Sequence, residues 1–167
     1  METDIADAAL RLSAAVLVGV LLGLNRDLAG KPIGMRTLAI VSLAGAVVSL
    51  STIHFQNLVD HPDALSRVVQ GIIQGIMGGI GFIGAGVILR DHKAQTVEGL
   101  TTASTVWLTA GLGIACGLDA WNVIAISVTF ALVTLVGITW LETAYLQRLA
   151  GNKPRSPSGK RDLSDPD

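Results

Sequence analysis

Long apolar stretches alternate with short polar connections along most of the chain. Five of them stand out, at residues 8–24, 37–55, 68–89, 100–118 and 120–141. A bilayer core about 30 Å thick needs about 20 helical residues at a rise of 1.5 Å each. None of the five stretches contains Asp or Glu in its interior. Only Arg11 brings a charge into one, a turn from its end, where a long side chain can reach the membrane interface. The pattern predicts an all-α fold, a polytopic membrane protein with five transmembrane helices.

Basic residues are distributed unevenly between the connections, and this predicts an orientation. Ten of the 12 lie in three regions, with three in 25–36, two in 90–99 and five after residue 141. In a chain that crosses five times these regions share one side, and the other side keeps only Arg11 and Arg67. Because cytoplasmic loops are enriched in Lys and Arg, we expect the N-terminus outside and the C-terminus in the cytoplasm.

The chain is expected to divide into a membrane domain and a tail. Residues 1–145 form the transmembrane domain, and the acidic first four residues are unlike the basic start of a cleavable signal peptide. We therefore expect the first stretch to remain as an anchor. Residues 146–167 are expected to form a disordered cytoplasmic tail. From residue 151 on they are almost entirely Pro, Ser, Gly and charged residues, a composition that cannot form a packed core.

Composition narrows the class of protein further. Half of the 167 residues are hydrophobic and 15% are charged, whereas soluble domains carry about a quarter charged residues. The formal net charge of −1 argues against a generally basic nucleic-acid-binding protein. The single cysteine, Cys116, excludes an intramolecular disulfide and a Cys-based zinc site. Its place inside the fourth stretch predicts a small packing residue.

The third stretch is unusually rich in glycine. Its glycines are Gly71, Gly75, Gly78, Gly79, Gly81, Gly84 and Gly86. On a helix, five of them share an arc of roughly 100°, with Gln74 on or beside it, and the isoleucines fall on the opposite side. Because small faces let membrane helices approach closely, we predict that this helix is the packing hub and turns its isoleucines toward lipid. The motif Gly113-x-x-x-Gly117 in the fourth stretch is its expected partner.

Motifs for enzymatic chemistry lack the context they need. Gly79-x-Gly81-x-x-Gly84 has the dinucleotide-binding spacing, but that motif requires a preceding strand, and here it lies inside an apolar helix. The sequence contains no phosphate-binding loop motif, no Ser/His/Asp set and no paired catalytic carboxylates. We therefore expect no cofactor and no enzyme. His54, Asp60, His61 and Asp63 are expected in a solvated outer loop.

Several motifs resemble those of the MgtC/SapB family of membrane proteins. They are LGLNRD at 22–27, GMRTL at 34–38, GIGFIGAGVI at 79–88 and VEGLTTAS at 97–104, the last continuing to Trp107. The resemblance covers about residues 10–140. It implies a bacterial inner-membrane protein linked to growth at low magnesium. The family often has Glu-Arg-Glu where this chain has Asn25-Arg26-Asp27, and some members continue into a soluble cytoplasmic domain.

Polar residues at the cytoplasmic ends of the first four helices form a candidate functional surface. They are Asn25, Arg26, Asp27, Arg36, Thr37, Arg90, Glu98, Thr101 and Thr102. One interpretation is an ordinary positive membrane margin with surface ion pairs of about 0–1 kcal/mol each. The other is a binding surface in which Arg26 and Arg36 hold a carboxylate or a phospholipid headgroup.

Further polar side chains lie within the third and fourth stretches. They are Gln70, Gln74, Thr101, Thr102, Ser104, Thr105 and Thr109. Hydrogen bonding between helices is the favoured role. The alternative is a polar lining for a permeation path.

We expect a non-enzymatic regulator or adaptor that acts through contacts with other membrane proteins or with a second copy of itself. The alternative is a transporter or channel for magnesium or another small ion. A Mg²⁺ path usually offers carboxylate ligands, and intramembrane ionisable residues are the usual mark of an ion pathway. The apolar stretches contain no carboxylate in their interiors, which weakens transport without excluding it.

Overall fold

The structure, a computed structural model, describes residues 5–53, 62–91, 96–138 and 140–141. Its helices are α1 (Ile5–Leu28), α2 (Met35–Ile53), α3 (Pro62–Val87), α4 (Leu100–Gly117) and α5 (Trp121–Leu132), and α5 continues into a π-helical stretch, η2 (Val133–Gly137). Each helix coincides with one of the five apolar stretches. The helical fold predicted from the apolar pattern is therefore confirmed.

The connection between α3 and α4 contains a hairpin that the sequence did not predict. Strands β1 (Leu89–Asp91) and β2 (Thr96–Glu98) pair antiparallel, with Leu89 opposite Glu98. We expected a loop at 90–99 and a third helix that reached residue 89. Helix α3 instead ends at Val87, and the backbone passes directly into β1.

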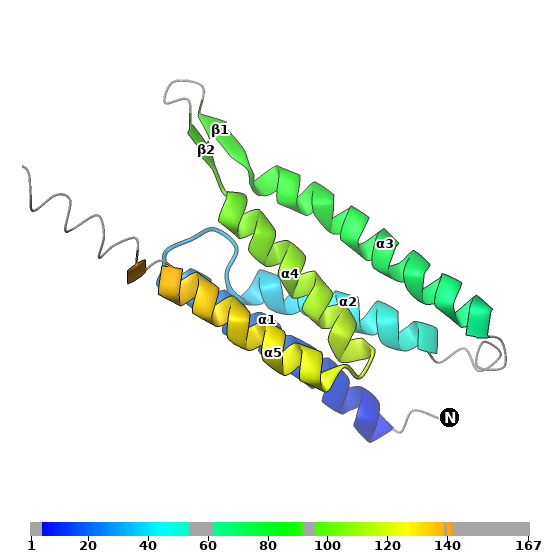
Figure 1. Cartoon of the computed structure of the whole chain (residues 1–167). Coiled ribbons are helices and arrows are strands. Elements are labelled where there is room, and N and C mark those ends of the chain that lie inside the picture. The colour runs from blue at the N-terminus through cyan, green and yellow to red at the C-terminus, as the bar shows by residue number, and fades with distance from the viewer. Residues whose placement is uncertain (1–4, 54–61, 92–95, 139, 142–167) are drawn as a thin grey trace, which may run out of the picture.

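Four described helices are long and apolar enough to cross a membrane. They contain the segments Ile5–Leu28, Met35–Thr52, Leu65–Val87 and Leu100–Gly117, whereas the apolar helix Trp121–Gly137 is shorter. Successive helices run in alternating directions, so the end of α1, the start of α2, the hairpin and the start of α4 share one end of the bundle (Figure 1). We call it the hairpin end. The five crossings and their orientation stay predictions.

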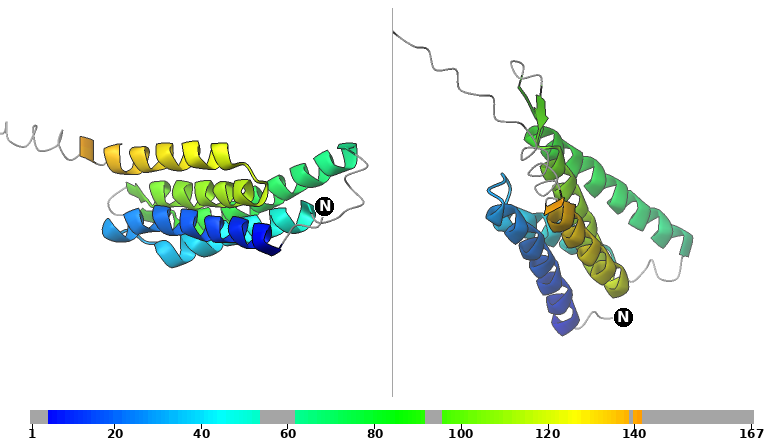
Figure 2. Two further views of the ribbon diagram at one scale, coloured as in Figure 1. Left: turned by 90° about the horizontal axis from the view of Figure 1, so that it is seen from below. Right: turned by 60° about the vertical axis from the view of Figure 1, so that its left-hand side comes forward.

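The core lies where α1, α2 and α4 meet. Helix α2 packs against both α1 and α4, and α5 lies alongside α4 (Figure 2). Ala15 and Leu22 of α1, Leu38 of α2, and Val106 and Ala110 of α4 are fully buried. The side chains at the crossing are small or medium-sized, as is usual where membrane helices associate by close packing.

Glycines on α2 and α4 allow this close approach. A Cβ atom at Gly45 would lie 2.8 Å from the carbonyl oxygen of Ala110, and one at Gly117 would lie 2.7 Å from that of Ala46. Gly113 faces the backbone of Ser42 even more closely. The small-residue motif of α4 therefore packs as predicted, but its partner is α2 and not the third helix.

A second pair of glycines joins α1 to α2. Cβ atoms at Gly19 and Gly23 would collide with the backbone at Ala39 and Met35, respectively. This contact was not predicted from the sequence. Their spacing, Gly19-x-x-x-Gly23, is a small-residue motif that could have indicated the contact.

Helix α3 is not the packing hub predicted from its glycines. Cβ atoms added at Gly71, Gly75, Gly78, Gly79, Gly81 or Gly86 would meet nothing within 4 Å, and one at Gly84 would make an ordinary 3.6 Å contact with Ala103 Cβ. Ile76 and Ile80, which were expected to face lipid, pack instead against the core, while Gln74 is exposed with the glycines. Helical periodicity separates the two faces of a helix, but both faces tolerate lipid, so it does not identify the one that turns inward.

That Arg11 reaches the membrane interface stays a prediction, and the structure shows which groups its side chain contacts. The residue is 9% exposed, its Nε lies 2.8 Å from Asp7 Oδ2, and its Nη2 lies 3.4 Å from Asp119 Oδ2. Its Nη1 also donates to the carbonyl oxygen of Gly117 at 3.2 Å. Two partly exposed carboxylates and the negative end of the α4 dipole are its partners, so the side chain joins the start of α1 to the end of α4.

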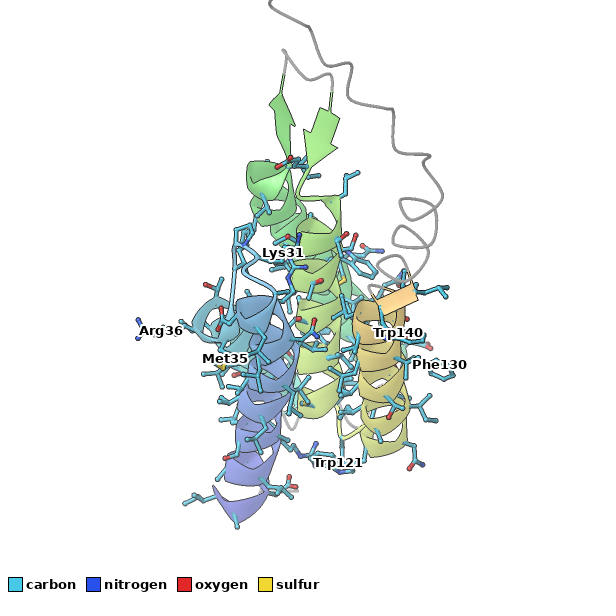
Figure 3. All side chains as sticks on the ribbon, turned by 90° about the vertical axis from the view of Figure 1, so that its left-hand side faces the viewer. Lys31, Met35, Arg36, Trp121, Phe130 and Trp140 are labelled. Carbon is cyan, nitrogen blue, oxygen red and sulfur yellow. The ribbon has the colours of Figure 1, made fainter. Side chains whose placement is uncertain are left out.

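The remaining features are single residues and the chain ends. Cys116 is fully buried in the core, which confirms its role as a packing residue. Trp121 and Trp140 are exposed near the two ends of α5 and η2 (Figure 3). Asp63, which was expected in a loop, lies instead in the first turn of α3, where it is exposed. The predicted tail and His54, Asp60 and His61 lie outside the described residues.

Candidate functional site

Most of the predicted surface residues gather at the hairpin end. Asn25, Arg26 and Asp27 lie in the last turns of α1, while Arg36 and Thr37 lie in the first turn of α2. Thr101 and Thr102 begin α4, and Glu98 ends β2. Arg90 lies in β1, and its side chain is outside the described part of the structure. Residues from α1, α2, the hairpin and α4 thus meet at one end of the bundle (Figure 1).

Arg26 is the most deeply buried charged residue at this end. It is 4% exposed, and its Nη2 donates to Thr102 Oγ1, 76 residues further along the chain. The buried Nε has no hydrogen-bond partner among the described residues. The ion pairs found in the described ranges join Arg11 to Asp7 and Asp119 and do not include Arg26. Arg26 therefore joins α1 to α4 through a hydroxyl, without a described carboxylate to balance its charge.

Asp27 serves the neighbouring helix instead. Its Oδ2 accepts a hydrogen bond from the backbone N–H of Met35, the first residue of α2, at 3.0 Å. The carboxylate thereby satisfies a free donor and faces the positive end of the helix dipole. A Cβ atom at Gly34 would overlap the Asp27 carboxylate, so a larger residue there would have to displace this side chain from its bond to Met35.

The turn between these helices follows from the way α1 ends. Gly30 has φ 63°, its N–H bonds to the Asp27 carbonyl, and the Lys31 N–H bonds to the Arg26 carbonyl. This pair of bonds is a Schellman motif, which favours glycine at the left-handed position. The motif ends α1 directly after Arg26 and Asp27 and fixes both side chains at the hairpin end.

Helix α4 begins without a side-chain cap. Its N-cap residue is Gly99, with φ 88° and no side-chain hydrogen bond, and a Cβ atom there would collide with the Val87 carbonyl oxygen. The N–H groups of Leu100, Thr101 and Thr102 are those that an α-helix leaves without an intrahelical carbonyl partner. The first turn of α4 therefore presents free donors and a positive dipole end beside Arg26.

The other predicted surface residues form an exposed rim. Arg36, Thr37, Glu98 and Thr101 are exposed, and Arg36 projects away from the bundle (Figure 3). Asn25 is half-buried. The structure therefore separates the predicted surface into a buried Arg26–Thr102 contact and a rim that other molecules can reach.

Hydroxyl groups in the core donate within their own helices. Ser49 and Thr52 of α2 donate to the carbonyl oxygens of Gly45 and Val48, and Thr105 and Thr109 of α4 donate to those of Thr101 and Thr105, all at 2.7–2.8 Å. Ser104 does the same at 3.0 Å. Of the residues predicted to bond between helices, Thr102 does so with Arg26 of α1, whereas Ser104, Thr105 and Thr109 bond within α4. The buried Ser42 Oγ has no described partner.

A small recess lies between α2, α3 and α4. It encloses about 180 Å³ of empty space, open mouth included, and is lined by Ser49, Thr52 and apolar side chains such as Ile72. Both hydroxyls already donate to backbone carbonyls. The recess is therefore mainly apolar in character.

Comparison with known proteins places the chain among a set of bacterial relatives. The family model described as "MgtC family" matches residues 12–144. Protein SrpB of Synechococcus elongatus is 35% identical over 167 aligned residues, which cover 93% of this chain and 91% of SrpB. Protein SapB of Bacillus subtilis is 33% identical over 138 residues, covering 81% of this chain and 58% of SapB.

Protein MgtC of Salmonella typhimurium is similar over a shorter region. It is 40% identical over 113 residues, which cover 68% of this chain and 44% of MgtC. The chain thus corresponds to nearly all of SrpB but to less than half of MgtC. No solved structure matches it.

Proposed function

Because this chain belongs to the MgtC family, we propose that it is a non-enzymatic regulator or adaptor of the bacterial inner membrane. It acts in adaptation to low magnesium or a related stress, through contacts with other membrane proteins. The competing function is transport of magnesium or another small ion. The two differ in what the helix bundle must do, because a transporter needs a polar route through it and an adaptor needs an exposed binding surface.

The packing of α1, α2 and α4 carries this proposal. Their backbones approach so closely that a single added Cβ atom at Gly45 or Gly117 would come within 2.8 Å of a carbonyl oxygen. Mg²⁺ gives up its water reluctantly and usually retains several water ligands when bound. Contact this close between backbones favours a rigid scaffold over a route for a hydrated ion.

The polar groups of the core support the same function. The hydroxyls of Ser49, Thr105 and Thr109 donate to carbonyls one turn earlier in their own helices, which satisfies them locally. Such groups need no water or ion in order to be buried. Their bonds support a structural role for the polar residues of α2 and α4.

The exposed rim is the surface on which we place the partner contacts. Arg36 and Thr37 stand in the first turn of α2, and Glu98 and Thr101 stand beside the start of α4. Charged groups at the edge of an interface steer association and select partners. Arg36 is the best test residue because it is exposed and its removal leaves the core packing unchanged.

Magnesium flux distinguishes the two functions directly. We expect purified full-length protein in liposomes loaded with a magnesium-sensitive dye to pass no more Mg²⁺ than protein-free vesicles. An unfolding scan of the same preparation should confirm that the protein is folded. Influx that rises in proportion to the amount of protein would replace the adaptor proposal with transport.

A complementation assay tests the adaptor role in cells. In a strain that lacks this protein and grows poorly at low magnesium, Arg36→Ala should fail to restore growth while reaching normal membrane abundance. Arg67→Ala is the matched control, because Arg67 is also exposed but lies on α3 near the other end of the bundle. Equal rescue by both variants would remove the rim from the proposal.

A further inference from the structure

We propose that Arg26 and the first turn of α4 form a binding site for one phosphate-type oxyanion. The site goes beyond the adaptor role, since it assigns a ligand to the buried Arg26 guanidinium and to backbone N–H groups of α4, whereas the partner contacts are placed on exposed side chains of the rim. The ligand is a phosphoryl group, either free in solution or carried by a lipid headgroup. Three features of the hairpin end support the assignment.

The first feature is that Arg26 has no ion-pair partner among the described residues. The residue is 4% exposed, its Nε has no described hydrogen-bond partner, and its described polar contact is to the Thr102 hydroxyl. The adjacent carboxylate, Asp27, bonds instead to the Met35 N–H at 3.0 Å. A buried guanidinium without a counter-charge is costly, and a bound anion would remove that cost.

The second feature is the uncapped start of α4. Gly99 offers no side-chain oxygen to the free N–H groups of the first turn, and the helix runs for 18 residues behind them. Such a terminus attracts anions through its N–H donors and its dipole. Arg26 reaches this same turn through Thr102. The Arg26 guanidinium and the positive dipole end of α4 therefore lie close together, although like charges repel each other.

The third feature is access from the membrane margin. Leu100 and Thr101 are exposed, so an oxyanion can approach the N–H donors from outside while Arg26 contributes its charge from within. Glu98 is also exposed and forms no described ion pair with Arg26. A guanidinium and converging N–H groups are the usual partners of phosphate oxygens. The start of an apolar helix is also the depth at which lipid phosphates are found.

Thermal unfolding of the full chain in a non-ionic detergent tests the proposal. One arm adds inorganic phosphate, with sodium chloride at equal ionic strength as control, and another adds phosphatidylglycerol against phosphatidylcholine. A rise in Tm with phosphate identifies a free anion as a sufficient ligand. A rise with phosphatidylglycerol alone identifies an anionic headgroup. No rise in either arm would overturn the proposal.

Two variants, each with a matched control, assign the effect to this site. Arg26→Gln should abolish the rise, whereas Arg36→Gln, which removes the same charge from the exposed rim, should retain it. Thr101→Asp places a carboxylate in the first turn, so it should raise the Tm without ligand by about 1–4 °C and remove the response. Thr37→Asp, the matched change on α2, should keep the response. Because Thr101→Asp leaves Arg26 intact, it decides the matter even if Arg26→Gln fails to fold, and a retained response in it would also overturn the proposal.

Discussion

Two buried arginines on α1 illustrate how single residues fix this bundle. Arg11 lies between Asp7 and Asp119 and also bonds to the Gly117 carbonyl, whereas Arg26 contacts a hydroxyl. Both join α1 to α4, one at each end of the helix pair. The Arg11 guanidinium lies beside two carboxylates and the negative end of α4. The Arg26 guanidinium lies beside the positive end of α4. The contacts of Arg11 are therefore stabilising by themselves, whereas those of Arg26 would be stabilised by a bound anion.

Asp119 and Arg11 should contribute unequally to stability. Asp119 is half-exposed and lies 3.4 Å from Arg11, so Asp119→Asn should cost only about 0–1 kcal/mol. Asn also tolerates the left-handed conformation that Asp119 adopts at φ 65°. Arg11→Ala removes both ion pairs and the bond to Gly117, and it should cost about 1–3 kcal/mol. Unfolding in mixed micelles measures both, and equal losses would contradict this division.

Asp27 allows a separate test of the α1–α2 connection. Replacing it with Ala leaves the Met35 N–H without its acceptor, and this should lower stability by about 0.5–2 kcal/mol, as the loss of a helix cap does. Asp27→Asn keeps an oxygen acceptor and should recover most of that loss. The same unfolding assay compares the two, and a loss in Asn as large as in Ala would show that charge and not the hydrogen bond matters.

At the scale of the helix, the glycines of α4 and α3 have opposite environments. Gly113→Ala pushes a methyl group into the backbone of α2 at Ser42 and should destabilise the protein by about 1–3 kcal/mol. Gly78→Ala enters open space on α3 and should be neutral or stabilising by up to about 1 kcal/mol. Both variants change one glycine in an apolar helix, so they are matched controls. A larger loss at Gly78 than at Gly113 would restore α3 as the packing hub.

The existence of each helix could be predicted because long apolar runs without acidic residues have few alternatives in a membrane protein. The partners of each helix could not, since Gly113-x-x-x-Gly117 shows a small face but not which neighbour it meets. The hairpin was missed because its strands have only three residues each, too few for an alternating pattern to be recognised.

The residues of the candidate site could be predicted from the sequence, but their arrangement in space could not. Arg26 and Thr102 could both be identified from the resemblance, but their contact could not be predicted because they lie 76 positions apart in the chain. The burial of Arg26 could not be predicted either, because a basic residue near a helix end is normally expected to reach the interface. Sequence therefore located the end of the bundle that carries the polar residues, and only the packing separated Arg26 from the exposed Arg36.

At the scale of the whole molecule, α5 determines how many times the chain crosses the membrane. Trp121–Gly137 has 17 residues, which give about 25 Å of helix against a bilayer core of about 30 Å. Its exposed apolar side chains, including Val123, Ile126 and Phe130, nevertheless suit contact with lipid. A short span can be accommodated by local thinning of the bilayer and by interfacial anchors such as Trp121 and Trp140. We therefore expect α5 to cross.

Cysteine labelling in intact cells tests both the orientation and the fifth crossing. On a Cys116→Ala background, cysteine is introduced at Asp63, at Lys31 or at Arg155. Asp63 lies at the start of α3, and Lys31 lies at the hairpin end, where basic residues gather (Figure 3). A membrane-impermeant thiol reagent should label position 63 and should reach position 31 only after the membrane is permeabilised. The reverse pattern would invert the orientation. Position 155 should behave like position 31 if α5 crosses, and labelling at 155 together with 63 in intact cells would leave four crossings.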